Sequence, residues 1–157
     1  ANQRAAAAGV RMTHDMQDLN RSFPGQAQGT HTEQLAAAIF ALAERYRPVL
    51  VLDLHEAGTR PDPATREIVN TLILGRHARA AEIALDVLEA FNAERDGKPF
   101  SFLAGAPPGS LNREVSRRLA IPVITVETDR RTPLPERVET QLDLLARLLA
   151  TVGAPIR

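Results

Sequence analysis

The chain has 157 residues, of which 44% are hydrophobic and 24% charged, and this composition is typical of one folded domain rather than a disordered segment. Nineteen basic residues balance nineteen acidic ones, so net charge provides no attraction for nucleic acid or an anionic membrane. No apolar run approaches the roughly 20 residues that a membrane-spanning helix needs. Because cysteine is absent, any metal site has to use the four histidines and the carboxylates.

The N-terminal part of the chain predicts an irregular segment followed by a helix. Residues 1–29 contain several glycines and a proline, which disfavour regular structure. Thr30 and Glu33 form a capping-box pattern, which predicts a helix start. The spacing of the apolar residues predicts that one face of this helix is formed by Leu35, Ile39, Leu42 and Tyr46.

Four apolar runs of strand length follow, at residues 49–54, 68–74, 100–103 and 121–126. The first run is continuously apolar up to Asp53 rather than alternating, and this pattern predicts a strand buried on both faces.

Helical patterns separate these runs. Residues 77–94 carry one apolar stripe, Ser110 is placed to cap the next helix, and Thr132-Pro133 starts the last one. The last helix is predicted to align Val138, Leu142, Leu145 and Leu149. Strands alternating with helices, without a repeat or linker, predict a single α/β layered domain over residues 1–157.

Two strand ends carry residues capable of chemistry, and ligands of open α/β sheets bind at the carboxyl ends of strands. His55 follows Asp53 by two residues, so both side chains are expected on one side of the strand, where the carboxylate can orient the imidazole of a metal ligand. A histidine satisfied by a backbone carbonyl is the alternative. Glu56 should point the other way and have a structural role. Glu127 ends a buried strand, which suits a general base of raised pKa, although a solvated acid fits the pattern too.

Other polar residues lie in loops. Asn20 and Arg21 offer the paired donors that bind a carboxylate, and Arg11 is a weaker candidate. The loop at 107–112 is either a pocket wall or a simple helix entry. The other three histidines, expected to be solvated, are His14, His31 and His77.

Three strings of residues occur in one order: Asp18-Leu-Asn-Arg-Ser-Phe-Pro-Gly25, Asp53-Leu-His-Glu56 and Thr125-Val-Glu-Thr128. Together they resemble the zinc carboxypeptidase superfamily, most closely its succinylglutamate desuccinylase/aspartoacylase branch. The segment from Asn2 to Arg11 is also similar to that branch, with Gln3 where a proline is common. The resemblance implies a three-layer α/β/α sandwich with a mixed, largely parallel sheet.

The resemblance also implies roles for individual residues. His55 matches the third zinc ligand. Glu127 matches the glutamate that activates the zinc-bound water and passes its proton to the leaving amine. Arg11 matches the arginine that polarises the scissile carbonyl, and Asn20 with Arg21 matches the pair that binds a substrate carboxylate. The loop that shapes the specificity pocket corresponds to the segment containing Ser110 and Asn112.

The sequence departs from the family pattern in two ways. The first two zinc ligands of the family form a His-x-x-Glu motif, and no such motif occurs in the 157 residues. We therefore expect that an N-terminal segment with these ligands and neighbouring strands lies upstream of Ala1, and that this chain alone binds zinc weakly and is inactive. The carboxypeptidases proper use a tyrosine near the specificity loop, whereas the only tyrosine here is Tyr46, and this difference favours the deacylase branch.

Three functions follow as hypotheses. The first is a zinc-dependent hydrolase of amide bonds, a deacylase or desuccinylase acting on N-acyl amino acids or related small amides. The second is a metallocarboxypeptidase acting on peptides, including cell-wall peptides. The third is a metal-free homologue that binds carboxylates without hydrolysis. All three predict a small-molecule or peptide partner with a carboxylate, and none predicts a nucleic acid or a membrane.

Overall fold

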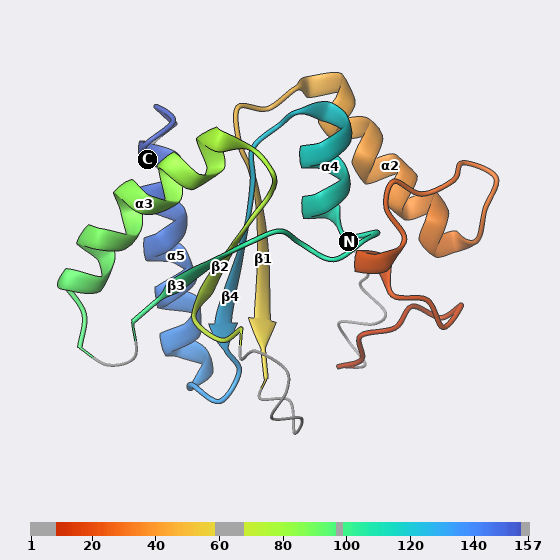
Figure 1. Ribbon diagram of the computed structural model, residues 1–157. Coiled ribbons are helices and arrows are strands. Elements are labelled where there is room, and N and C mark those ends of the chain that lie inside the picture. The colour runs from red at the N-terminus through yellow and green to blue at the C-terminus, as the bar shows by residue number, and fades with distance from the viewer. Residues whose placement is uncertain (1–8, 59–67, 97–98, 155–157) are drawn as a thin grey trace.

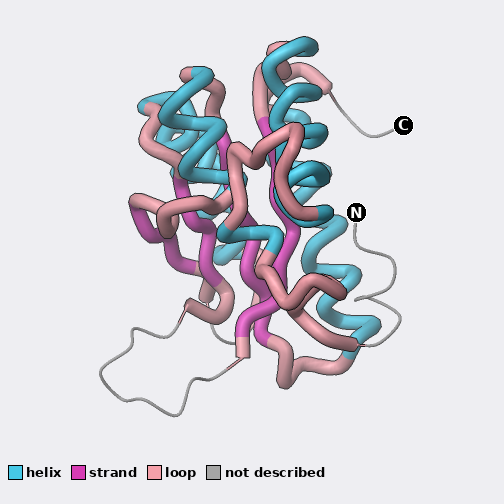
Figure 2. The backbone as a smooth tube through the Cα atoms, turned by 90° about the vertical axis from the view of Figure 1, so that its right-hand side faces the viewer, coloured by secondary structure: helices cyan, strands magenta, loops and turns pink. Residues whose placement is uncertain are grey.

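The computed structural model describes residues 9–58, 68–96 and 99–154, which form three layers (Figure 1). A central sheet separates α3 and α5 on one side from α2 and α4 on the other, and Figure 2 shows the same layers from the side. The α/β/α sandwich with a mixed, largely parallel sheet is therefore confirmed. The elements are η1 (Leu19–Arg21), α2 (His31–Tyr46), β1 (Val51–Ala57), β2 (Thr71–Leu74), α3 (Ala78–Ala93), β3 (Ser101–Ala104), α4 (Leu111–Leu119), β4 (Val123–Asp129) and α5 (Leu134–Ala150).

The four strands of the described chain lie in the order β1-β4-β2-β3. β1 runs parallel to β4, β2 runs antiparallel to β4, and β3 runs parallel to β2. The carboxyl ends of β1 and β4 thus lie side by side at the same end of the strands, and the register pairs His55 with Glu127.

Hydrophobic side chains fill the space on both faces of the sheet. On the α3/α5 face, Leu72 and Ile124 pack with helix residues such as Ile83 and Leu144. On the α2/α4 face, Val123 packs with Val115 and other residues of α4 and α2. The predicted helix at 77–94 is confirmed as α3, whose buried residues are Ala80, Ile83, Ala84, Val87, Leu88 and Phe91.

The prediction that the strand at 49–54 is buried on both faces is wrong. β1 lies at an edge of the four-stranded sheet, and Leu54 is 45% exposed. The strand that is buried throughout is β4, because it has a strand on either side and helices over both faces. A continuous apolar run therefore indicated a strand but not its place in the sheet.

The predicted apolar faces of two helices also differ from the buried ones. On α2 the buried residues are Thr32, Ala36 and Ala43, while Leu42 and Tyr46 are exposed. The fully buried positions of this helix thus carry small side chains, and Phe40 is the larger apolar residue that packs, partly buried, against the core. On α5 the sheet-facing residues are Thr140, Leu144 and Leu148, whereas Val138 and Leu142 are exposed.

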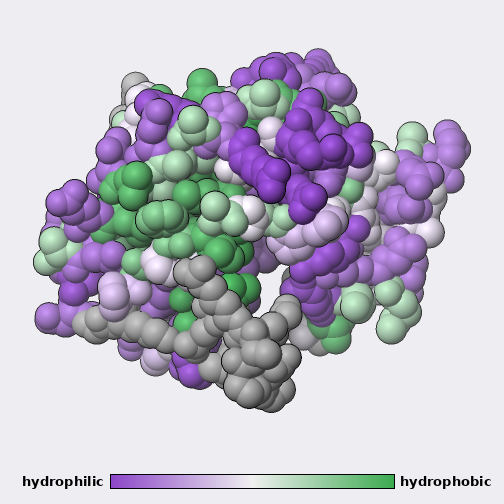
Figure 3. Space-filling view, viewed as in Figure 1, coloured by the Kyte–Doolittle hydropathy of each residue, from purple (hydrophilic) through white to green (hydrophobic). Residues whose placement is uncertain are grey.

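Hydrophobic side chains also gather on the surface over α3 and β3, at the sheet edge opposite β1 (Figure 3). They include Leu85 and Phe102, both about half exposed. In the described residues, no helix combines the length and the apolar composition required to cross a lipid bilayer.

Candidate functional site

The α2/α4 face of β1 and β4 changes from apolar to ionisable along the strands. Its successive register pairs are Val51 with Val123, Asp53 with Thr125, and His55 with Glu127. α2 and α4 cover the apolar end, where Val51 and Val123 join the core. The polar end lies at the carboxyl ends of the two strands, where ligands of open α/β sheets bind.

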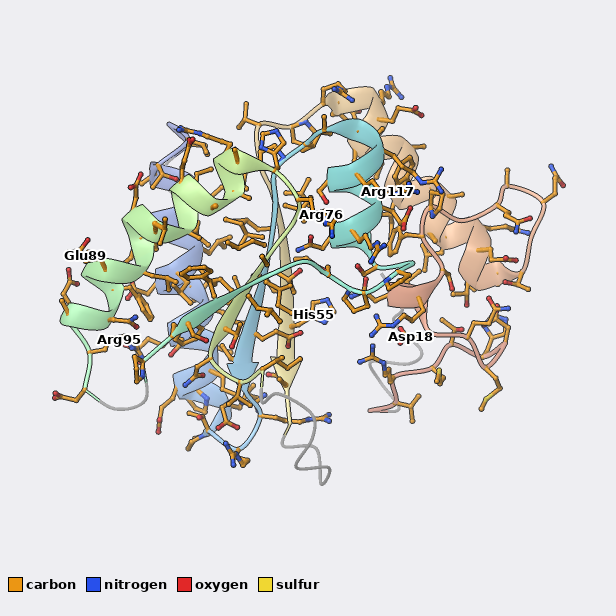
Figure 4. All side chains as sticks on the ribbon, viewed as in Figure 1. Asp18, His55, Arg76, Glu89, Arg95 and Arg117 are labelled. Carbon is orange, nitrogen blue, oxygen red and sulfur yellow. The ribbon has the colours of Figure 1, made fainter. Side chains whose placement is uncertain are left out.

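His55 is held by the carboxylate predicted to orient it. Its Nε2 lies 3.0 Å from Oδ1 of Asp53, and the Nδ2 of Asn20 approaches the same nitrogen at 3.3 Å. The hydrogen bond to Asp53 raises the pKa of His55, against the opposing effect of burial. Nδ1 accepts no hydrogen bond among the described residues, so this geometry leaves Nδ1 as the nitrogen for ligation. Figure 4 shows the imidazole extending from β1 toward the segment that contains Asp18.

Asp53 uses one oxygen for this contact. Its other oxygen, Oδ2, is buried and has no hydrogen-bond partner in the described part of the chain. A buried carboxylate oxygen without a donor is costly, so this atom marks a place where a further donor would be favourable.

Glu127 is 8% exposed. Burial raises its pKa, the charge of His55 lowers it, and the charge of Asp53 raises it again. A carboxylate held above its ordinary pKa is a stronger base, which is the property expected of a residue that removes a proton from water. Its role as general base stays a prediction.

The backbone of His55 is anchored from the opposite side by residues that sequence reasoning missed. Gln141 of α5 donates from Nε2 to the carbonyl oxygen of His55 at 2.9 Å and to Thr128 Oγ1 at 3.2 Å. The sequence held one signal for this contact, which is that Gln141 directly follows Thr140, a residue on the sheet-facing side of α5. Glu56 forms an ion pair with Arg137 of the same helix, in agreement with its expected structural role.

Asn20 links the N-terminal segment to two parts of the site. Its Oδ1 accepts a hydrogen bond from the backbone N–H of Leu111, the first residue of α4, at 2.8 Å. Its own backbone N–H donates to Asp18, which caps η1. The amide of Asn20 therefore bridges the start of α4 and the imidazole of His55. Arg21 is exposed and donates to the carbonyl oxygen of Asn20, so its guanidinium lies at the surface beside this bridge.

The rest of the string 18–25 explains how this segment is fixed. Phe23 is buried, and its N–H donates to the carbonyl oxygen of Gly109. A Cβ on Gly109 would lie 2.3 Å from the carbonyl oxygen of Arg21, and a Cβ on Gly25 would lie 2.2 Å from backbone atoms of α2. Both glycines have positive φ, so close backbone contact and conformation each exclude a larger side chain.

Arg11 lies near the site but is engaged elsewhere. Its Nε and a terminal nitrogen are each 2.7 Å from Oδ2 of Asp18. Its charge still lowers the pKa of both His55 and Glu127. The structure thus brings together five predicted residues around the adjacent carboxyl ends of β1 and β4, namely Arg11, Asn20, Asp53, His55 and Glu127. The catalytic role of Arg11 stays a prediction.

Ser110 and Asn112 have structural contacts. Ser110 caps α4, accepting from the N–H of Arg113 and donating to the carbonyl oxygen of Pro107. Asn112 is 1% exposed and donates to the carbonyl oxygen of Ile73 and to Thr125 Oγ1. Substrate contact stays a prediction for both, although neither side chain offers an exposed surface.

The other histidines do not join the site. His14 and His31 are exposed, and their rings pack against each other with centroids 4.8 Å apart. His77 caps α3 through its side chain.

A complete zinc site is not present in the described residues, because no group of three or more histidine, cysteine or acidic side chains there could hold a metal ion. A catalytic zinc takes three protein ligands, and among the residues that the structure describes His55 alone has the position and the free ring nitrogen of one. The described part of the chain therefore has a position for one of the three zinc ligands and not for the other two.

Fold and site together define an α/β domain with a histidine and a glutamate at adjacent strand ends. The model of the succinylglutamate desuccinylase/aspartoacylase catalytic domain matches residues 1–152. The chain belongs to this family. A search of curated proteins gives no match.

Solved structures show the same fold. A succinylglutamate desuccinylase/aspartoacylase from Rhodobacter sphaeroides is 21% identical with a TM-score of 0.68, and the alignment covers 99% of this chain and 44% of that one. The product-bound ectoine utilization protein EutE (DoeB) from Ruegeria pomeroyi is 22% identical, with a TM-score of 0.67 and coverage of 99% and 46%. The D,L-carboxypeptidase Csd4 from Helicobacter pylori is 17% identical, with a TM-score of 0.66 and coverage of 88% and 38%. The chain thus spans less than half the length of these relatives.

Proposed function

We propose that this chain is part of a zinc-dependent hydrolase that cleaves the amide bond of an N-acyl amino acid or a related small amide. The observation that carries the proposal is the pairing of His55 and Glu127 in register at adjacent strand ends. Membership of the desuccinylase/aspartoacylase family supports the same reaction class.

The described residues divide the work as follows. His55, oriented by Asp53, would supply one zinc ligand through Nδ1, and the other two ligands would come from outside the 157 residues. Zinc, when bound, supplies a water of lowered pKa. Glu127 would take the proton of that water and deliver it to the leaving amine nitrogen. Arg11 would leave Asp18 to bind the oxygen on which negative charge develops.

The substrate carries a carboxylate in this proposal. Arg21 is exposed beside Asn20 and forms no ion pair among the described residues, so its guanidinium is available to an anion. Tyr46 ends α2 ahead of β1, so it lies toward the amino end of that strand, away from the His55 end. Its position fits the deacylase branch better than a carboxypeptidase with a site tyrosine.

Three measurements test the proposal. The reading frame upstream of Ala1 should encode His-x-x-Glu, and the intact protein should contain one zinc per chain. The intact protein should also hydrolyse one or more members of a panel of N-acyl amino acids. A zinc-free intact protein that still binds carboxylates would instead establish the non-catalytic alternative.

A peptidase is the second candidate, because Csd4, a D,L-carboxypeptidase, has the same fold. The same panel should include tripeptides and cell-wall peptides. Faster hydrolysis of these peptides than of every acyl amino acid would favour the peptidase over the deacylase.

A further inference from the structure

A groove lies between α3 and the outer edge of β3, on the α3/α5 face and at the sheet edge far from β1. Its volume is about 440 Å³. The apolar part of its lining includes Leu85 and Phe102, which are 53% and 45% exposed, and Figure 3 shows this hydrophobic area on the surface. Large apolar side chains gathered in a concave site favour an apolar occupant.

Along its outer edge, the backbone at β3 has two open positions, Phe102 and Ala104, and one position, Phe100, whose polar groups are already satisfied. Ser101 and Gly105 donate their N–H groups toward β2, so Phe102 and Ala104, which alternate with them, turn N–H and C=O outward. At Phe100 the outward groups are satisfied by Asn92, whose side-chain amide donates to the carbonyl oxygen and accepts from the N–H at 2.9 Å each. Asn92 thus takes the place of a neighbouring strand at Phe100 alone.

Among the described residues that line the groove, the charged ones are both acidic. Asp86 and Glu89 of α3 line it, and neither forms an ion pair with a described residue. An occupant with a cation beside its apolar part would therefore be favoured over an anionic one.

We propose that this groove binds an extended peptide segment of a partner protein by strand addition to β3. The segment pairs its backbone with Phe102 and Ala104, inserts an apolar side chain beside Leu85 and Phe102, and places a lysine or arginine against Asp86 and Glu89. Backbone pairing at a sheet edge supplies affinity in this mode, and the groove supplies selectivity.

The test uses blocked pentapeptides and the ¹⁵N-labelled intact protein. The peptide Arg-Val-Phe-Val-Arg should shift the amide signals of Phe102 and Ala104 and slow their hydrogen exchange at least tenfold. Glu-Val-Phe-Val-Glu and Arg-Ser-Ser-Ser-Arg should each bind at least tenfold more weakly. Equal binding of the basic and acidic peptides, or shifts confined to other strands, would overturn the proposal.

Two variants separate the parts of the interaction. Ala104→Pro removes an outward N–H that the sheet does not use, so the fold should persist while peptide binding falls at least tenfold. Asp86→Lys with Glu89→Lys should reverse the preference toward the acidic peptide, and Glu139→Lys on the exposed side of α5 should leave it unchanged. Dimerisation of the intact protein without peptide, if Ala104→Pro abolishes it, would show that a second copy occupies the edge, and would overturn the partner assignment.

Discussion

His55 and Glu127 are direct neighbours in the parallel pair of β1 and β4, and both point to the face that carries Asp53. The ladder that fixes their relative position also continues into the hydrophobic core at Val51 and Val123. Their geometry is therefore held by the sheet itself and not by loops, which is the arrangement that a preorganised site requires.

Replacing Glu127 by Gln in the intact protein should lower kcat by about 100-fold to 10,000-fold, because the amide keeps the shape but cannot accept the proton. Zinc content, measured by atomic absorption, should not change, since Glu127 is not an expected ligand. Glu139→Gln on the outer side of α5 is the matched control and should keep full activity. A Glu127→Gln enzyme with normal turnover would exclude Glu127 as the base.

Asn20 allows its two contacts to be separated. Asn20→Ala loses the acceptor for the Leu111 N–H, and the free energy of unfolding should fall by about 1 kcal/mol. Asn20→Asp keeps an oxygen that accepts from the Leu111 N–H, so its free energy of unfolding should stay nearly unchanged. It loses the amide nitrogen beside His55, and its KM should therefore rise. Denaturant titrations and steady-state kinetics measure the two effects. Equal stability of Asn20→Ala and the unmodified chain would contradict the bridging role.

Gly109→Ala should destabilise the fold by more than Gly153→Ala. Both glycines have φ of +74°, so both alanines experience the same backbone strain. Only at Gly109 would the new Cβ meet a neighbour, the carbonyl oxygen of Arg21 at 2.3 Å, while Gly153 has open space. We expect a difference of about 1–3 kcal/mol in the free energy of unfolding. Identical midpoints in a urea titration would show that the 18–25 segment moves aside freely.

Glu114 should contribute to acid sensitivity. Burial raises the pKa of this carboxyl. Hydrogen bonds from Arg118, the Gly109 N–H and Arg117 together lower it by more than burial raises it, so the pKa in the folded chain lies below the ordinary value of 4.5. A lowered folded pKa stabilises the fold above pH 4.5, and this stabilisation is lost as pH falls through the folded pKa. Glu114→Gln should thus be less stable near neutral pH and lose less stability on acidification. Parallel pH-stability curves for the two chains would count against this contribution.

Local signals predicted some elements well because the decisive contacts are close in sequence. The capping box at Thr30 and Glu33 and the cap at Ser110 both form as expected. Apolar periodicity was less reliable, because α2 and α5 each have two candidate stripes and only packing against the sheet selects one. For α2 that choice buries Ala36 and Ala43 and exposes Leu42.

The site also divides into features that local sequence predicts and contacts that only the packing of the layers creates. His55 and Glu127 were predictable as polar ends of apolar strands, and the structure makes them register partners. The Asn20 bridge to Leu111 spans 91 positions in the chain and Gln141 reaches His55 across 86, so no local pattern contains either contact. Such contacts depend on how the layers meet.

The gradient from Val51 and Val123 to His55 and Glu127 covers about 13 Å of strand, at roughly 3.3 Å per residue. Folding and chemistry therefore draw on different positions of the same two strands. Natural variation at the polar end can alter or remove a reaction without loosening the apolar anchor. A fold built in this way can acquire new substrates, or persist after losing its activity, more readily than one whose reactive groups are also its core.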